Sequence, residues 1–190
     1  MPTKGKRPRV RSVKLAPLEA GDKEQFVRDN QEAFLYGATQ EFGLRNADFE
    51  EDGQIISRRT ILRSIGARGA ETYRIVARGE VAGGVVLKID RTKRRGELVL
   101  LFVSPELHGL GIGQAAWRAV ERLHPEVRVW ETCTPYFEKR NIHFYVNRCG
   151  FHIVEFFCAM HRGPNESECS GECPDEEGPD EMFRFEKRMK

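Results

Sequence analysis

Residues 108–123 read HGLGIGQAAWRAVERL, a run in which three glycines at alternate positions precede a helical pattern. Glycine frees the backbone and carries no side chain, so three glycines within five residues indicate a main chain that approaches another group closely. A helix that begins just after them points its free N–H groups toward that group. The run therefore predicts an anion-binding loop, and a phosphate is the natural ligand.

The sequence on both sides of this run predicts a mixed fold. Asp22, with Gln25 three positions on, resembles a capping box at the start of an amphipathic helix. Three successive strand-like runs before the glycines indicate an antiparallel meander. The expected strands are 13–16, 71–79, 80–90, 96–105, 127–135, 151–160 and 181–189, and the expected further helices are 57–65, 112–123 and 136–149.

The helix at 112–123 lies between two expected strands, which predicts a crossover and one parallel strand pair. The alternating run 181–189 is expected to close the sheet. We therefore expect an α/β (α+β) domain with a mixed, mostly antiparallel sheet of about seven strands and helices on both faces.

Length and charge set the domain limits. The 190 residues suit one domain. The sequence contains no run of eighteen apolar residues, so no membrane span is predicted. Residues 1–10 are expected to form a basic flexible tail, and 11–190 the domain, with an acidic, cysteine-containing loop at 162–181. The tail lacks aromatic residues, so no nucleic-acid partner is expected. Because no secretion signal is present, a cytoplasmic location is predicted.

Five cysteines, an odd number, favour free thiols in a reducing compartment. Cys158, His161, Cys169 and Cys173 could supply four zinc ligands, but their spacing matches no strong zinc template. We therefore predict no metal.

The segment LLFVSPELHGLGIGQAAWRAVERL, followed by a strand, an Asn-containing helix and FYVNRCGF, resembles the GCN5-related N-acetyltransferase superfamily. Its coenzyme A signature is matched at His108, Gly111 and Gly113, with His108 in place of the usual Arg or Gln. The resemblance implies an acetyl-CoA-dependent N-acetyltransferase. The residues implied to bind the cosubstrate are Phe102, Val103, His108, Gly109, Leu110, Gly111, Ile112, Gly113, Gln114 and Asn141.

The resemblance also implies a bulge in the strand before the loop, which frees backbone N–H groups for the pantetheine and the thioester carbonyl. Phe102 and Val103 are the expected contributors of these groups. Leu100 and Leu101 are expected to line the acyl pocket.

Two catalytic roles follow from this reaction. Tyr145 can donate a proton to the departing thiolate, although it lies five residues before Gly150 where the family usually has four; Tyr136 is the substitute. The alternative is that Tyr145 packs in the core. Glu131 is the first candidate for the general base and Glu97 the second, while His108, His143 and His152 are expected to be solvated or packed.

Rival functions remain open at this point. Gly111, Gly113 and Ala116 fit a dinucleotide motif, but the preceding meander lacks crossover helices. A non-catalytic acyl-CoA-binding domain is a second alternative. For an enzyme, the acidic stretch favours a cationic small-molecule or peptide amine as acceptor. Whether the chain forms a homodimer is left open.

Overall fold

Seven strands form one sheet in the computed structural model, in the order β1-β2-β3-β4-β5-β7-β6. The structure describes residues 8–37, 39, 54–136, 138–161 and 181–190. The strands are Lys14–Pro17 (β1), Ala70–Ala77 (β2), Glu80–Asp90 (β3), Arg95–Val103 (β4), Val129–Pro135 (β5), His152–Phe157 (β6) and Met182–Arg188 (β7). β4 and β5 pair in parallel and all other neighbours are antiparallel, which confirms the mixed, mostly antiparallel sheet.

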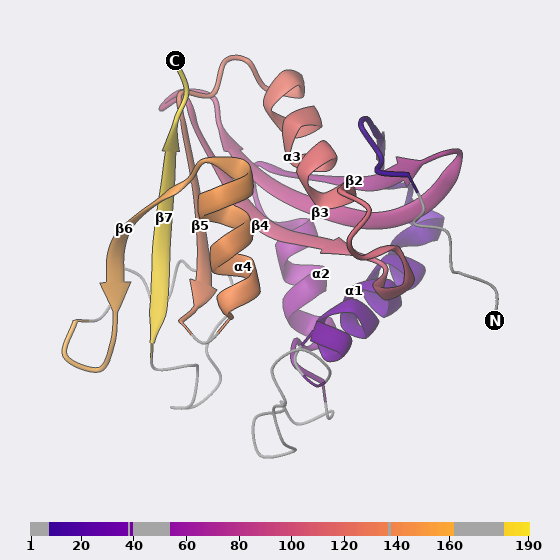
Figure 1. Ribbon diagram of the computed structural model, residues 1–190, viewed down its shortest axis with the longest axis horizontal. Helices are drawn as coiled ribbons and strands as arrows, with labels where there is room; N and C mark the ends of the chain where they lie inside the picture. The colour runs from indigo at the N-terminus through magenta and orange to yellow at the C-terminus, as the bar shows by residue number, and fades with distance from the viewer. Residues whose placement is uncertain (1–7, 38, 40–53, 137, 162–180) are drawn as a thin grey trace.

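Helices cover both faces of the sheet, as predicted. Figure 1 shows α3 and α4 on one side and α1 and α2 on the other. We call these the α3 face and the α1 face. The helical segments are Ala20–Asp22 (η1), Lys23–Tyr36 (α1), Arg58–Gly66 (α2), Pro105–Leu107 (η4), Ile112–Leu123 (α3), Lys139–His143 (α4) and Phe144–Cys149 (η5).

Each face has its own apolar core. On the α3 face, Trp117 of α3 meets Trp130 of β5 edge to face, with ring centroids 5.2 Å apart. Gly96 of β4 lies beneath Trp130, where a Cβ would come within 2.4 Å of the indole ring. On the α1 face, Phe26 packs against Phe102 with ring centroids 5.1 Å apart. Two cores therefore hold the middle of the sheet from opposite sides.

The start of α1 differs from the predicted capping box. Asp22 makes no side-chain cap, and its Oδ2 instead accepts a hydrogen bond from Nε of Arg74 at 2.5 Å. Asp29 accepts a second one from Nη1 of Arg74 at 2.6 Å. Arg74 is 4 % exposed, and a buried charge must be paired. Asp22 therefore pairs with this guanidinium and does not cap the helix. The hydrogen bond from Arg74 also lowers the pKa of Asp22.

The C-terminal elements also differ in part from the prediction. β7 inserts between β5 and β6, so β6 and not the last strand of the chain forms this edge of the sheet. The expected helix at 136–149 consists of the short α4 followed by a π-helical turn, η5. β7 pairs antiparallel with both β5 and β6. This pairing contradicts the mostly parallel, doubly wound sheet that the dinucleotide-binding alternative requires.

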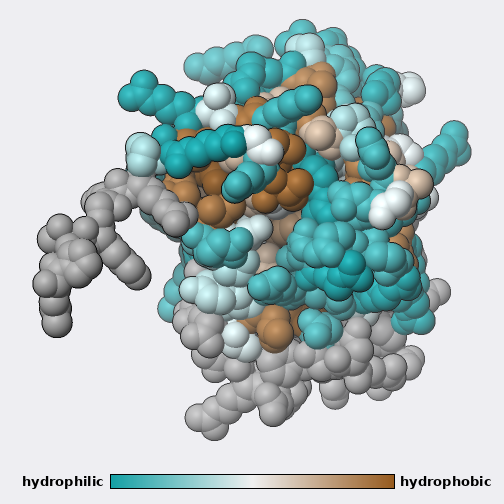
Figure 2. Space-filling model, turned by 90° about the vertical axis from the view of Figure 1, so that its right-hand side faces the viewer, coloured by the Kyte–Doolittle hydropathy of each residue, from teal (hydrophilic) through white to brown (hydrophobic). Residues whose placement is uncertain are grey.

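The surface is largely polar on the side that Figure 2 displays, and hydrophobic side chains gather mainly in the upper part of that view. Within the described part of the chain, no helix is long and apolar enough to cross a membrane.

Candidate active site

The glycine-rich loop joins β4 to α3. Gly109 and Gly111 have φ of +78° and +81°, a left-handed conformation that side-chain-bearing residues rarely adopt. Gly111 is the residue that caps the start of α3. The two glycines therefore bend the chain sharply enough for a helix to begin at Ile112.

The backbone N–H groups of this loop are free to bind an anion. Ala115 is the first residue whose N–H donates back along the helix, to the Gly111 carbonyl at 3.0 Å. The N–H groups of residues 109–114 donate to no carbonyl among the described residues. They stand at the positive end of the α3 dipole, so the loop fits a pyrophosphate.

Gly113 is required for a different reason. A Cβ at this position would lie 3.3 Å from the Phe144 ring of η5. On the next residue, Nε2 of Gln114 donates to the Arg148 carbonyl at 2.8 Å. The start of α3 therefore packs tightly against η5, and the small residue permits that approach.

His108 links three elements around the loop. Its Nε2 lies 2.9 Å from the Val103 carbonyl, and its Nδ1 lies 3.2 Å from Nη1 of Arg140. The Tyr36 ring of α1 packs edge to face on the imidazole, with centroids 5.6 Å apart. His108 thus holds the end of β4 near α1 and α4, and its contact with the cosubstrate stays a prediction.

β4 and β5 separate soon after they meet. Their parallel pairing covers only Arg95–Glu97 with Val129–Glu131. One further link exists, where Oγ1 of Thr132 donates to the Leu98 carbonyl at 2.9 Å. From there β5 pairs with β7 alone, while β4 continues beside β3. Figure 1 shows the two halves of the sheet running in different directions from this point. We call this opening the splay.

A bulge in β4 decides which groups face the splay. Val86 pairs with Leu100 but Leu87 pairs with Leu98, so Val99 is the extra residue. The predicted strand therefore contains a bulge. After it, Leu100 packs on the α1 face with Phe102, whereas Leu101 packs on the α3 face. Leu100 and Leu101 thus do not share one face, contrary to the acyl pocket expected from the sequence.

The same register orients the backbone N–H groups. Ser104 N–H donates to the Ala82 carbonyl at 2.9 Å, and hydrogen-bonded positions alternate along an antiparallel pair. The N–H of Phe102 therefore points toward β3. The N–H groups of Val103 and Leu101 point to the other side, where β5 has separated. The role of Val103 as a donor stays a prediction, and the N–H of Leu101, which the sequence did not indicate, faces the same side.

Tyr145 lies in the core with its hydroxyl near the base of the splay. The π-helical turn η5 takes up one extra residue, which accounts for the five-residue spacing to Gly150. The ring packs against Phe151 and Phe185, with centroids 5.8 and 5.5 Å away. Burial raises the pKa of the Tyr145 hydroxyl, an effect that a hydrogen bond with Thr132 partly opposes. Tyr136, the substitute, is 49 % exposed at the end of β5.

Asn141 is engaged within its own helix turn. Its Nδ2 donates to Oε2 of Glu138, and the same carboxylate oxygen accepts a hydrogen bond from Thr134 Oγ1 at 2.8 Å. Asn141 therefore ties α4 to the end of β5. Its predicted contact with the cosubstrate is not tested by this arrangement.

Glu131 and Glu97 are register partners at the base of the splay. Both alternate with residues of the α3 face, so they lie on the α1 face, opposite Tyr145. Glu131 binds Arg95 and also Nη1 of Arg184, the latter at 3.1 Å. These pairs belong to a charged network that continues through β7 to β6.

Glu97 lies in a different electrostatic environment. Burial raises the pKa of its carboxyl group, the nearby charge of Glu131 raises it further, and Lys88 on β3 partly opposes the shift. A partly buried carboxylate with a raised pKa can accept a proton near neutral pH. The sequence ranked Glu131 ahead of Glu97 as the candidate general base, whereas in the structure it is Glu97 that has the raised pKa.

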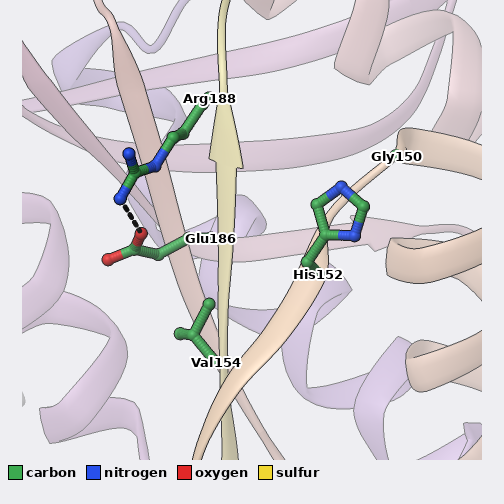
Figure 3. Close-up of a pocket in the computed structure, with 5 residues that line it drawn as sticks. All are labelled: Gly150, His152, Val154, Glu186 and Arg188. Carbon is green, nitrogen blue, oxygen red and sulfur yellow. Dashed lines mark ion pairs between the residues drawn. The ribbon is translucent and has the colours of Figure 1, made fainter.

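A hollow of about 260 Å³ lies over β6 and β7. Figure 3 shows His152, Val154 and the Glu186–Arg188 ion pair around it. The nearest oxygen and nitrogen of that pair are 4.0 Å apart. His152 is exposed, which is one of the two outcomes expected from the sequence. We assign this hollow no function.

The zinc alternative is tested only in part. Cys158 and His161 form an isolated β-bridge, and His161 Nε2 lies 2.9 Å from Glu155. Within the described residues, no group of three or more His, Cys, Asp or Glu side chains could hold a metal. Cys169 and Cys173, with the acidic loop, lie outside the described residues.

Comparison with known proteins identifies the family. The model of the acetyltransferase (GNAT) family matches residues 28–151. The chain belongs to this family. Membership confirms the resemblance seen in the sequence and supports an acyltransferase.

Relatives extend over nearly the whole chain. The uncharacterized protein YrkN of Bacillus subtilis is 44 % identical over 180 residues, which cover 94 % of each chain. The ribosomal-protein-S18-alanine N-acetyltransferase of Escherichia coli has a TM-score of 0.63 at 12 % identity and covers 93 % of each chain. The spermidine N-acetyltransferase of Vibrio cholerae, solved with CoA and spermine, has a TM-score of 0.60 at 16 % identity, covering 93 % of this chain and 95 % of that one.

Proposed function

We propose that this protein transfers an acetyl group from acetyl-CoA to a primary amine, which attacks directly in a ternary complex. The splay carries this proposal. It combines backbone donors at Leu101 and Val103 with a carboxylate and a phenol on its two faces. The glycine loop lies at the end of the same strand, where it can bind the pyrophosphate.

Each group has a distinct task in this reaction. Val103 and Leu101 N–H groups stabilise the negative charge that develops on the thioester oxygen when the amine nitrogen attacks the carbonyl carbon. Glu97 accepts the proton that the amine loses, directly or through water. The carbon–sulfur bond then breaks, and the Tyr145 hydroxyl gives its proton to the departing thiolate. The products are the N-acetylated amine and CoA with a free thiol.

The choice of Glu97 over Glu131 as the base rests on their partners. Glu131 is held by Arg95 and Arg184, and losing its negative charge would leave those cations under-compensated. Glu97 has a raised pKa. Glu131 then acts on the reaction through its charge, which raises the proton affinity of Glu97.

The raised pKa of Tyr145 keeps its hydroxyl protonated at neutral pH. It is therefore present as a donor when the thiolate forms. Its burial against Phe151 and Phe185 fixes the ring, so the hydroxyl is held in one place. The fixed position is useful in a proton donor, whereas the raised pKa makes the hydroxyl a weaker acid.

A cationic amine is the acceptor class that we favour. Glu97, Glu131, Glu155 and Glu186 all lie on the α1 face of the splayed half of the sheet. Lys88, Arg95, Arg184 and Arg188 lie beside these carboxylates and offset their charge, so the support for a cationic acceptor is the acidic stretch of the sequence. The Vibrio cholerae structure with spermine is of a protein that takes such an acceptor.

The first test is release of free thiol from acetyl-CoA in the presence of a panel of amines. We expect release with one or more cationic amines. CoA binding without release for any amine would favour the non-catalytic alternative.

A matched pair of variants tests the cosubstrate loop. Both Asp and Asn tolerate the left-handed conformation of Gly111, and they are of equal size, so Gly111→Asp and Gly111→Asn differ mainly in charge. We expect Gly111→Asp to weaken CoA binding more than about tenfold relative to Gly111→Asn, because the carboxylate repels the pyrophosphate. Equal CoA affinities of the two folded variants in calorimetry would place the phosphates elsewhere.

A further inference from the structure

The segment that precedes β1 lies against the glycine loop. The N–H of Val10 donates to the Leu110 carbonyl at 2.8 Å, in the middle of the loop. The side chains of Val10 and Val13 pack against a core cluster that contains Ile112. We call residues 8–13 the N-terminal strap. The described part of the predicted tail, residues 8–10, thus touches the domain at its proposed cosubstrate site.

The bond from Val10 constrains one peptide group of the loop. The carbonyl of Leu110 and the N–H of Gly111 belong to the same peptide unit, which is trans, so they point in opposite directions. Because the strap holds the carbonyl, the N–H of Gly111 must point away from the strap. It is one of the N–H groups that donate to no carbonyl among the described residues.

Gly111 also lies near the backbone of the strap, at an ordinary contact distance. A Cβ at Gly111 would lie 3.5 Å from the Val10 carbonyl oxygen. Gly111 has no side chain to restrict its backbone, and glycine has the greatest conformational freedom of any residue. The strap supplies the restriction that the glycine itself lacks.

We propose that the N-terminal strap is a positioning element for the pyrophosphate of the cosubstrate, and that Val10 is its positioning residue. The inference rests on the proposed function, because it assumes that the loop binds CoA. In this role the strap pre-orients the N–H of Gly111, so less conformational entropy is lost when the pyrophosphate binds.

A second residue anchors the strap. Nη2 of Arg78 donates to the Pro8 carbonyl at 2.7 Å. Arg78 and Gly79 form the two-residue turn between β2 and β3, and Arg78 has φ of +56°. Asn is much preferred over Arg at this position of such a turn. The sequence thus keeps an unfavourable turn residue at the position from which a guanidinium reaches the strap.

The test compares two variants of Val10. Val10→Pro removes the N–H that binds Leu110, whereas Val10→Ala trims the side chain and keeps that N–H. We expect Val10→Pro to raise the Kd for CoA about five- to tenfold in calorimetry, as the loss of one orienting hydrogen bond predicts. Val10→Ala measures the effect of losing the side chain alone, and we expect the Kd of Val10→Pro to lie well above that of Val10→Ala.

Pantetheine separates positioning from general damage. It carries the thiol arm of CoA but no pyrophosphate, so its affinity, measured by NMR titration, should not change in Val10→Pro. An equal loss of affinity for CoA and pantetheine would mean that the strap supports only the fold, and would overturn the inference.

Arg78→Asn provides an independent variant that should fold well. It improves the turn and removes the anchor, so we expect an unchanged or higher Tm together with a Kd for CoA raised about two- to threefold. Unchanged CoA affinity in both Val10→Pro and Arg78→Asn, with normal wild-type binding, would overturn the role of the strap alone. Wild-type protein that binds no CoA would overturn the proposed function as well.

Discussion

Replacing Glu97 by Gln should make the protein more stable and less active at the same time. The carboxyl group is partly buried beside Glu131, and its pKa is raised in the folded protein. Gln keeps the shape of the side chain and removes the charge. The two effects can be measured independently on the same sample.

The stability effect has a defined pH window. Because the folded-state pKa of Glu97 lies above the unfolded value of about 4.5, the folded protein holds this proton more tightly than the unfolded chain. Stability is therefore lost as the pH rises from 4.5 through the folded pKa. Glu97→Gln removes that loss. We expect a higher Tm than wild type at pH 7 and a difference that vanishes below pH 4.5.

The activity effect follows from the proton that Glu97 must accept. Loss of a general base lowers kcat by about 10²- to 10⁴-fold, which corresponds to roughly 3–5 kcal/mol in the activation free energy. Glu131 is the closest carboxylate in register, but its ion pairs with Arg95 and Arg184 make it a poor replacement. In the wild type, kcat/KM should rise with pH through the raised pKa of Glu97. This acidic limb should be absent in the variant.

Glu131→Gln is the matched control. It removes a carboxylate that binds two arginines, so we expect lower stability at neutral pH and a smaller loss of kcat than in Glu97→Gln. The assay is thiol release at saturating amine and acetyl-CoA, with thermal unfolding measured at pH 4 and 7. A Glu97→Gln variant with wild-type kcat and an unchanged pH profile would refute the assignment of the base.

Three further outcomes are expected. Tyr145→Phe should lower kcat about a hundredfold or more with nearly unchanged CoA affinity, and full activity would leave Tyr145 with a packing role only. Gly96→Ala should lower the free energy of unfolding by about 1–3 kcal/mol in urea titrations, because the new Cβ meets the Trp130 ring, whereas an unchanged midpoint would show that the ring can move. If the acidic stretch attracts a cationic acceptor, the KM for that amine should rise, and its salt dependence should fall, when four carboxylates are replaced by amides. The four are Glu172, Asp175, Glu176 and Glu177.

Much of the fold could be predicted because its signals are local. The three glycines and the helical run after them place the loop and α3 within a few residues of their observed positions. The strand-like runs before and after them give the strands, and the single crossover helix gives the parallel pair. The position of β7 between β5 and β6 could not be predicted, because strand order depends on pairings between distant segments.

The candidate site depends more on non-local contacts. Val99 reads as an ordinary strand residue, yet its bulge exchanges the faces to which Leu100 and Leu101 point. Glu131 and Glu97 have the same chemistry in the sequence. Only the folded structure shows that Glu131 pairs with Arg95 and Arg184, and that burial raises the pKa of Glu97. A carboxylate's pKa is a property of its neighbours.

The sequence by itself determined that a glycine-rich loop precedes a helix within a mixed sheet, because glycine positions and hydrophobic periodicity act over a few residues. Only the tertiary structure decided where β4 leaves β5, which backbone N–H groups face the splay, and that Val10 bonds to Leu110. These features depend on hydrogen bonds between residues far apart in the chain. A shift of one residue in register would turn each side chain to the other face and alter every one of them.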